Sequence, residues 1–247
     1  MKPDLLDILL PARRASIRIP AMKLFLFDVD LTLIRTGGAG IRALDAAIAD
    51  LFGIEHAFRG VEFAGRTDRA ITEDGLTRAG LDASEESLLR VRSAYIRHLS
   101  VELASPGCTV HRLPGSKEIL ETLAGEPEFL CGLVTGNWKE GAFLKLAACG
   151  LDAFFRYGAF AENGRDRRML VRDAMDLAAR WSGSIFDPRN VWVVGDTPHD
   201  IDCGRAWGTN TLGVATGPYG SDALKEAGAT AVLGDLADTG AVMGILG

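Results

Sequence analysis

Two aspartates two positions apart, Asp28 and Asp30, follow directly after the apolar run Lys23–Phe27. If this run is a β-strand, side chains two positions apart lie on the same face of the sheet. Both carboxylates can then reach one reacting centre at the carboxyl end of the strand, where open α/β sheets bind ligands. The pair is therefore the first candidate for chemistry.

A second acidic pair, Asp196 and Asp200, follows another apolar run, Val191–Val194. The carboxyl ends of neighbouring parallel strands meet at one edge of a sheet, so these carboxylates are expected to converge with the first pair. Gathered carboxylates oppose one another's ionisation unless a cation neutralises them. A divalent cation with oxygen ligands, magnesium (Mg2+), resolves this conflict. The simpler alternative is that Asp30 and Asp196 only cap the N-termini of helices.

Short apolar runs separated by helical patterns supply the elements that would position these residues. The predicted strands are Lys23–Phe27, Phe129–Val134, Tyr157–Phe160, Val191–Val194, Thr211–Val214 and, more weakly marked, Ala231–Leu233. Helical patterns such as Lys139–Ala148 and Met169–Ala179 lie between them. Near-continuous apolar strands that alternate with helices predict an α/β fold with a Rossmann-like, doubly wound parallel sheet.

About a hundred residues separate the first two strands, although a crossover between parallel strands needs only a few dozen. The helices predicted in this stretch are Ile41–Leu51, Arg69–Ala79 and Ser84–Ser100. We therefore expect an inserted, all-helical cap domain over residues 37–112. Residues 1–36 and 113–247 are expected to form the catalytic core, with residues 1–20 as an N-terminal extension of no assigned role.

The bulk composition favours a small substrate. The chain has 247 residues, of which 47% are hydrophobic and 24% charged, and its formal net charge is −6. Nucleic acids and anionic membranes bind to basic faces, and the cluster Arg13, Arg14 and Arg18 is too short to provide one. The four cysteines have no paired spacing and are expected to be reduced. The prediction is a cytoplasmic protein that binds neither nucleic acid nor membrane.

The acidic motifs, together with one further segment, resemble those of the haloacid-dehalogenase-like (HAD) hydrolase superfamily, in its phosphatase branch. Residues Asp28–Thr32 are similar to the family's first motif, Leu133–Asn137 to its second and Gly195–Asp200 to its fourth. The helical insertion resembles the cap of phosphoglycolate-phosphatase-like members. Leu31 stands where many members have glycine, but that position supplies no catalytic side chain.

The family's third motif normally contains a lysine, and we identify no lysine at a suitable place in this sequence. Arg167 is our choice for its substitute, as in some phosphatase subfamilies, and Arg165 and Arg168 remain alternatives. A guanidinium would bind the phosphoryl group through charge-assisted hydrogen bonds. Without the neighbouring motifs, Arg167 would be interpreted as a solvated surface charge.

The resemblance implies a magnesium-dependent phosphatase that hydrolyses a small phosphorylated metabolite, a phosphate monoester. Asp28 would attack phosphorus and become an aspartyl-phosphate, while Asp30 would protonate the leaving alcohol and then activate water. The residues implied as metal ligands are Asp28, Asp30 through its backbone carbonyl, Asp196 and Asp200.

Substrate contacts are implied in two segments. In the second motif, Thr135, Gly136 and Asn137 would bind the phosphoryl group, with the Thr135 hydroxyl as a donor. In the insertion, residues 65–68 resemble a glycine-bearing loop that faces the active site in phosphoglycolate-phosphatase-like members. Arg66 in this loop would meet an anionic group on the far end of the substrate. Alternatively, the loop caps the helix that follows it, and the two roles are compatible.

Other functions remain open at this point. A phosphoglucomutase-like phosphotransferase uses the same core and differs in how the cap shields the phosphoenzyme from water. A metal-independent 2-haloacid dehalogenase also uses an aspartate nucleophile, but it needs neither Asp30 nor Asp196. A binding module that keeps the fold without turnover is disfavoured by the intact acidic pair. The sequence identifies neither the physiological substrate nor the oligomeric state.

Overall fold

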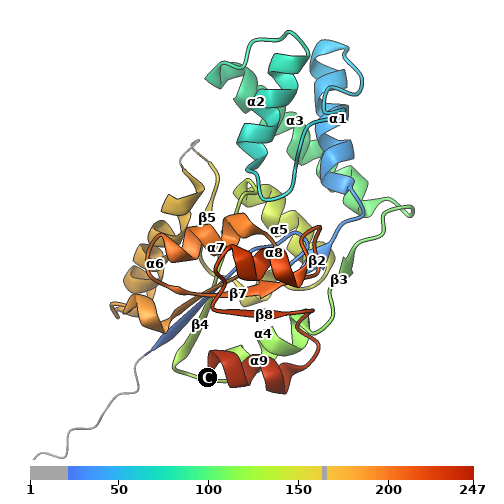
Figure 1. Cartoon of the computed structure of the whole chain (residues 1–247). Coiled ribbons are helices and arrows are strands. Elements are labelled where there is room, and N and C mark those ends of the chain that lie inside the picture. The colour runs from blue at the N-terminus through green and yellow to red at the C-terminus, as the bar shows by residue number, and fades with distance from the viewer. Residues whose placement is uncertain (1–21, 163–165) are drawn as a thin grey trace, which may run out of the picture.

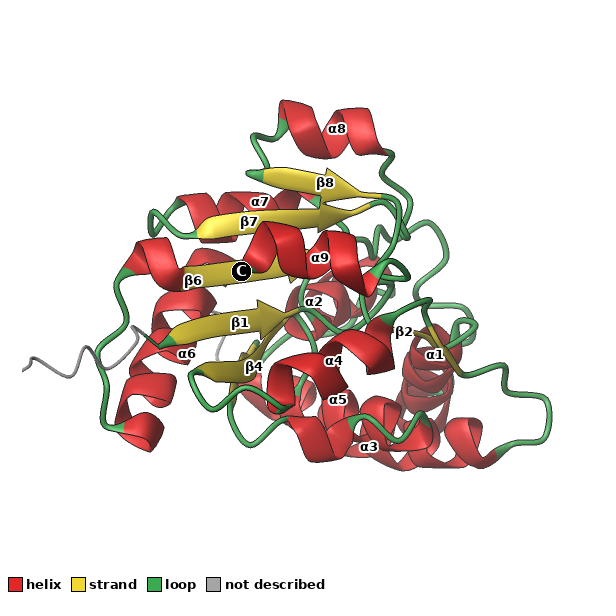
Figure 2. Cartoon of the chain, turned by 90° about the horizontal axis from the view of Figure 1, so that it is seen from below, coloured by secondary structure: helices red, strands yellow, loops and turns green. Residues whose placement is uncertain are grey.

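A six-stranded parallel sheet forms the centre of the computed structural model, which describes residues 22–162 and 166–247 (Figure 2). Two predictions fall outside the described residues, namely the extension over residues 1–20 and Arg165, an alternative to Arg167 in the third motif. The strands, in their spatial order, are β5 (Gly158–Phe160), β4 (Phe129–Thr135), β1 (Lys23–Phe27), β6 (Val191–Gly195), β7 (Asn210–Val214) and β8 (Ala231–Leu233). The predicted α/β fold with a parallel sheet is confirmed.

The central strand β1 is buried on both faces because helices cover both sides of the sheet. Phe25 and Phe27 point to one face, where they pack with residues of α4, α5 and α9. Leu24 and Leu26 point to the other face and pack with residues of α6 and α7. This alternation explains why the strand is apolar at every position after Lys23. The helices around the sheet are α4 (Ser116–Ala124), α5 (Lys139–Ala148), α6 (Arg167–Ser182), α7 (Pro198–Arg205), α8 (Ser221–Glu226) and α9 (Thr239–Leu246).

The register of the central strands brings the acidic motifs to one edge of the sheet. Phe27 at the end of β1 lies opposite Leu133 of β4 and Val194 of β6. The backbone N–H of Asp28 then donates to the Val194 carbonyl oxygen (2.9 Å), which continues the pairing past the last strand residue. The first, second and fourth motifs therefore leave the sheet side by side.

Three further helices lie beyond this edge of the sheet (Figure 1). We call them the helical unit, and they are α1 (Ala39–Phe52), α2 (Asp68–Arg78) and α3 (Glu85–Ala104). The unit has an apolar core of its own, which includes Leu44 and Ile48 of α1, Leu76 of α2, and Val91 and Leu99 of α3. The three helices predicted in the long insertion are thus present.

The chain enters and leaves the helical unit through a small antiparallel pair of strands, β2 (Ile34–Arg35) and β3 (His111–Arg112). The sequence does not predict this pair, because a two-residue strand carries no periodic pattern. Two short 3-10 helices, Asp152–Phe154 and Pro188–Asn190, complete the described elements.

All four cysteines are free thiols in the structure. Within the described residues, no helix combines the length and the apolar character needed to cross a membrane.

Candidate active site

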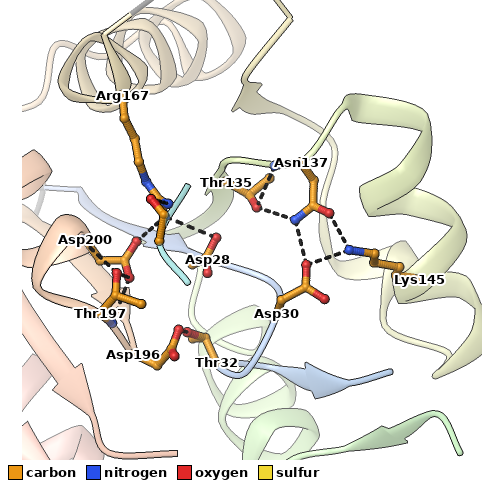
Figure 3. Close-up of polar contacts among 11 residues, drawn as sticks. Asp28, Asp30, Thr32, Thr135, Asn137, Lys145, Arg167, Asp196, Thr197 and Asp200 are labelled. Atoms are coloured by element: carbon orange, nitrogen blue, oxygen red, sulfur yellow. Dashed lines mark hydrogen bonds and ion pairs between the residues drawn. The ribbon is translucent and has the colours of Figure 1, made fainter. Parts of the chain in front are cut away.

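Three buried carboxylates meet at the carboxyl edge of the sheet. One carboxylate oxygen from each of Asp28, Asp196 and Asp200 lies within 4.8 Å of the other two (Figure 3). Burial raises the pKa of Asp28 to about 7 and that of Asp196 to about 8, and the charge of Asp200 adds to both shifts. Within the part of the chain that the structure describes, these carboxyl groups therefore lack a full set of compensating charges.

The donor set around Asp196 fits a magnesium ion. Its Oδ1 accepts a hydrogen bond from the Thr32 hydroxyl (3.3 Å), whereas its buried Oδ2 has no hydrogen-bond partner among residues 22–162 and 166–247. A buried carboxylate oxygen without a partner is costly, and hard oxygen ligands are those that magnesium prefers. A Cβ on Gly217 would lie 1.7 Å from this oxygen, so the glycine leaves the space that Asp196 occupies.

Arg167 reaches this cluster from the N-terminus of α6. One terminal nitrogen forms an ion pair with Asp200 Oδ1 and lies 3.6 Å from Asp28 Oδ1. The other donates to the backbone carbonyl oxygen of Gly65 in the helical unit (2.5 Å). The alternative Arg168 instead pairs with Asp202 on the surface (2.7 Å). Of the two described candidates for the third motif, Arg167 is the one that lies in the site.

Asp200 has a structural role as well as its place in the cluster. Its Oδ2 accepts hydrogen bonds from the backbone N–H (3.0 Å) and the hydroxyl (2.7 Å) of Thr197 at the start of α7. The pair forms a capping box that orders the first turn of this helix. A Cβ on Gly195 would lie 2.3 Å from the Asp200 carboxyl carbon, which explains the glycine in this motif.

The second motif lies on the other side of Asp28 and contacts Asp30. Asn137 Nδ2 donates to Thr135 Oγ1 (2.8 Å) and to Asp30 Oδ2 (2.9 Å). Thr135 is fully buried at the end of β4. The structure thus brings Asp28, Asp30, Thr135 and Asn137 to one place, as the sequence analysis expects.

Lys145 is a site residue that the sequence analysis missed. Its ammonium group donates to Asp30 Oδ2 (2.7 Å) and to Asn137 Oδ1 (2.6 Å) (Figure 3). The lysine lies in the middle of α5, far in sequence from the position where the family's lysine is expected. One signal was available, because Ala142, Lys145 and Leu146 follow helical spacing on the buried face. A lysine in such an apolar stripe needs a buried partner.

The glycine-bearing loop of the helical unit packs directly on the second motif. The Asp68 backbone N–H donates to the Gly136 carbonyl oxygen (2.8 Å), and Asp68 Oδ2 accepts from the Trp138 backbone N–H (2.9 Å). Burial raises the pKa of Asp68 to about 6, against the charge of Lys145. A Cβ on Gly136 would lie 2.5 Å from the Arg66 carbonyl oxygen, so the approach requires glycine.

The Arg66 side chain is held inside the helical unit. Its guanidinium forms an ion pair with Asp74 (2.7 Å) and donates to the backbone carbonyl oxygens of Glu62 and Ala70 (both 3.3 Å). Thr67 caps α2, because its hydroxyl oxygen accepts from the Ala70 backbone N–H (3.1 Å). The capping role of the loop is therefore present, and Arg66 would have to leave Asp74 to meet a substrate.

A cavity of about 490 Å³ lies between the sheet edge and the helical unit. On the sheet side it is lined by polar site residues, which include Asp28, Asp30, Thr135, Asn137, Lys145, Arg167 and Asp196. On the side of the helical unit it is lined mainly by apolar residues, which include Ile41, Leu44, Phe63, Ile71 and Tyr95. The arrangement places the acidic cluster at one wall of a cavity large enough for a small molecule.

The family of the chain follows from this arrangement and from comparison with known proteins. Residues 25–205 match the family model described as haloacid dehalogenase-like hydrolase. The match covers well over half of the chain and contains both acidic motifs, so the chain belongs to the haloacid dehalogenase-like hydrolase family. The resemblance found in the sequence is confirmed, and with it the expectation of a hydrolase.

One protein of similar sequence and two solved structures of similar fold illustrate what the chain resembles. Pyrophosphatase PpaX from Bacillus pumilus is 31% identical over 116 residues, which are 47% of this chain and 52% of that protein. The match therefore spans about half the length of this relative. The crystal structure of a predicted phosphoglycolate phosphatase from Haemophilus somnus has a TM-score of 0.69 at 17% identity, covering 91% of this chain and 99% of that one. A hydrolase from Pseudomonas syringae gives 0.66 at 21% identity, covering 90% and 98%. These two likenesses establish a shared fold.

Proposed function

We propose that this chain is a magnesium-dependent phosphatase that hydrolyses a small phosphate monoester through an aspartyl-phosphate on Asp28. The observation that carries the proposal is the position of the Asp28 carboxylate, close to those of Asp196 and Asp200 and in one cavity with Asp30. Phosphoryl transfer through a carboxylate needs a nucleophile, a cation and a second acid at one point. Family membership supports the same class of reaction.

The charges around Asp28 suit an anionic substrate. Asp28, Asp196 and the backbone carbonyl of Asp30 would hold the magnesium ion, with Asp200 completing its surroundings. When bound, the ion offsets the negative charge that the nucleophile and the phosphoryl group bring together. Arg167 would bind phosphoryl oxygens with its planar guanidinium.

Two displacements at phosphorus account for the hydrolysis. In the first, Asp28 forms a bond to phosphorus while the bond to the leaving oxygen breaks, and Asp30 gives its proton to that oxygen, which departs as an alcohol. In the second, Asp30 removes a proton from a water molecule that attacks phosphorus, and the bond to Asp28 breaks. Inorganic phosphate leaves and both carboxyl groups are restored. Thr135, Gly136 and Asn137 would hold the phosphoryl oxygens throughout.

The division into a core and a cap belongs to the same proposal. Residues 37–112 would form a cap domain over a catalytic core of residues 1–36 and 113–247. The separate apolar core of the helical unit and the paired strands β2 and β3 at its base support this division. Closure of the cap on the second motif would exclude water from the reacting groups. The size of the cavity supports a small phosphorylated metabolite as substrate.

Phosphate release from an aryl phosphate tests the proposal. Purified protein should release phosphate with magnesium and should stop when the metal is chelated. Asp28→Asn should lower kcat by at least about a thousandfold, because the amide cannot replace the carboxylate nucleophile. The exposed aspartate Asp222 on α8 provides the control, and Asp222→Asn should behave as the wild-type protein. Activity that survives Asp28→Asn or chelation contradicts the proposal.

The same preparation distinguishes the two alternative reactions. A 2-haloacid dehalogenase would release chloride from a chlorinated acid without metal. A phosphotransferase would pass the phosphoryl group to a second hydroxyl of a sugar phosphate rather than to water. A panel of phosphorylated two- and three-carbon acids, sugars and nucleotides would then rank the substrates.

A further inference from the structure

A buried lysine contacts the side chain that the proposed reaction uses as its acid. Lys145 lies on the buried face of α5, and only 5% of its side chain is exposed. Burial of a cation is unfavourable unless it is paired and hydrogen-bonded. Its partners are the Asp30 carboxylate and the Asn137 side-chain carbonyl oxygen. Burial opposes the charge of Lys145, but its carboxylate neighbours, Asp30 foremost, raise its pKa above the usual value.

The contacts form a closed triangle around one oxygen of Asp30. Asp30 Oδ2 accepts from Lys145 Nζ (2.7 Å) and from Asn137 Nδ2 (2.9 Å). Asn137 is fixed in turn, because its Oδ1 accepts from Lys145 (2.6 Å) and its Nδ2 donates to Thr135 Oγ1 (2.8 Å). Rotation of the Asp30 carboxyl group would break both bonds and leave Lys145 buried without its carboxylate partner. The triangle therefore fixes the orientation of Asp30.

Asp30 and Lys145 both line the cavity, but Asp30 is far more exposed in it. The Asp30 side chain is 35% exposed, against 5% for Lys145. The helical unit also closes over the ammonium group, since a Cβ on Gly40 would lie 3.6 Å from Lys145 Nζ and 3.7 Å from the Tyr95 hydroxyl. Lys145 is thus placed to act on the substrate through Asp30.

We infer that Lys145 is a positioning residue, which together with Asn137 holds the Asp30 carboxyl group in the orientation for proton transfer to the leaving oxygen. The inference rests on the proposed phosphatase reaction. In that reaction the bond between phosphorus and the leaving oxygen breaks, the electron pair stays on the oxygen, and the Asp30 proton neutralises it. An alcohol leaves poorly without this proton, whereas a dinitrophenolate leaves readily without it.

Two esters with different leaving groups separate a positioning role from a general structural role. Lys145→Met keeps the length of the side chain and removes its charge. In this variant kcat/KM for benzyl phosphate should fall about 10- to 100-fold, because acid catalysis by Asp30 is impaired. For 2,4-dinitrophenyl phosphate it should fall less than about threefold. The ratio of the two values on one preparation does not depend on how much of the protein is folded. If Lys145→Met yields no folded protein, Lys145→Gln serves for the same comparison.

A double-mutant cycle tests whether Lys145 acts through Asp30. With Asp30→Asn in place, Lys145→Met should change kcat/KM for benzyl phosphate by less than about threefold, because the group that it positions is gone. Lys139 on the exposed first turn of the same helix provides the control, and Lys139→Met should leave both esters unaffected.

The outcomes separate this inference from the function on which it rests. Equal losses for both esters in Lys145→Met, or losses that multiply with those of Asp30→Asn, overturn the inference and indicate direct contact with the phosphoryl group. The proposed function then stands, provided that the wild-type protein turns over both esters with magnesium. A wild-type protein that turns over neither ester overturns the proposed function and this inference with it.

Discussion

At the scale of single residues, the site contains buried charges that the described residues compensate only in part. Asp28 and Asp196 have pKa values raised to about 7 and about 8, chiefly by burial and next by the charge of Asp200. Arg167 offsets part of this charge through its contacts with Asp200 and Asp28. Among the residues that the structure describes, none donates a hydrogen bond to Asp196 Oδ2, and this is the observation that most favours a further ligand at the site.

Replacing the least compensated carboxylate should stabilise the metal-free protein and abolish its activity. At about pH 8.5, Asp196→Asn removes a buried negative charge, so the free energy of unfolding in the presence of a chelator should rise on the order of 1–3 kcal/mol. Phosphatase activity should be lost at the same time, because a proposed metal ligand is gone. Urea denaturation with a chelator measures the first effect. A variant that is less stable than the wild-type protein would show that Asp196 is not strained by its charge.

At the scale of secondary-structure elements, the sequence predicts the helices and strands that have a recurring apolar pattern. It does not predict the elements that lack one. The strands and the helices of the insertion were predictable because apolar residues recur along them. Strands β2 and β3 have too few residues for a pattern. Loop 65–68 and its contacts with Gly136 and Trp138 depend on tertiary packing. Lys145 was not predicted because its contacts with Asp30 and Asn137 arise from the packing of α5 and are not visible in the sequence.

The close approach of the loop to the second motif has a measurable consequence. In Gly136→Ala the new Cβ would meet the Arg66 carbonyl oxygen at 2.5 Å, so the loop must move away from the reaction centre. We expect kcat/KM for the aryl phosphate to fall on the order of 10- to 100-fold, since misplacements of about 1 Å have such effects. Gly220→Ala is the matched control, because a Cβ there meets nothing within 4 Å. Unchanged kcat/KM in Gly136→Ala would show that the loop does not need this position.

At the scale of the whole molecule, the carboxylate cluster couples stability to pH and, under the proposed function, to magnesium. The raised pKa values mean that the folded, metal-free protein keeps protons on Asp28 and Asp196 that the unfolded chain has already lost above about pH 4. Its stability therefore falls as the pH rises toward about 8. Under the proposed function, magnesium would compete with the same protons and replace their charge.

Thermal unfolding with and without magnesium checks this coupling. The increase in Tm caused by magnesium should be small at about pH 6 and should grow as the pH rises to about 8.5, because protons leave the cluster over this range. Asp196→Asn should remove most of the increase at every pH. A magnesium effect that is independent of pH, or that persists in Asp196→Asn, would place the ion elsewhere.

The most direct test of the account looks for the phosphoryl group on Asp28 itself. Asp30→Asn should still react with 2,4-dinitrophenyl phosphate, whose leaving group needs no proton, but should hydrolyse the intermediate slowly because the base for water is missing. After an acid quench, mass spectrometry should then find one added phosphoryl group on the peptide that contains Asp28. Release of dinitrophenolate with that peptide unmodified, or with the phosphoryl group on another residue, would contradict the account.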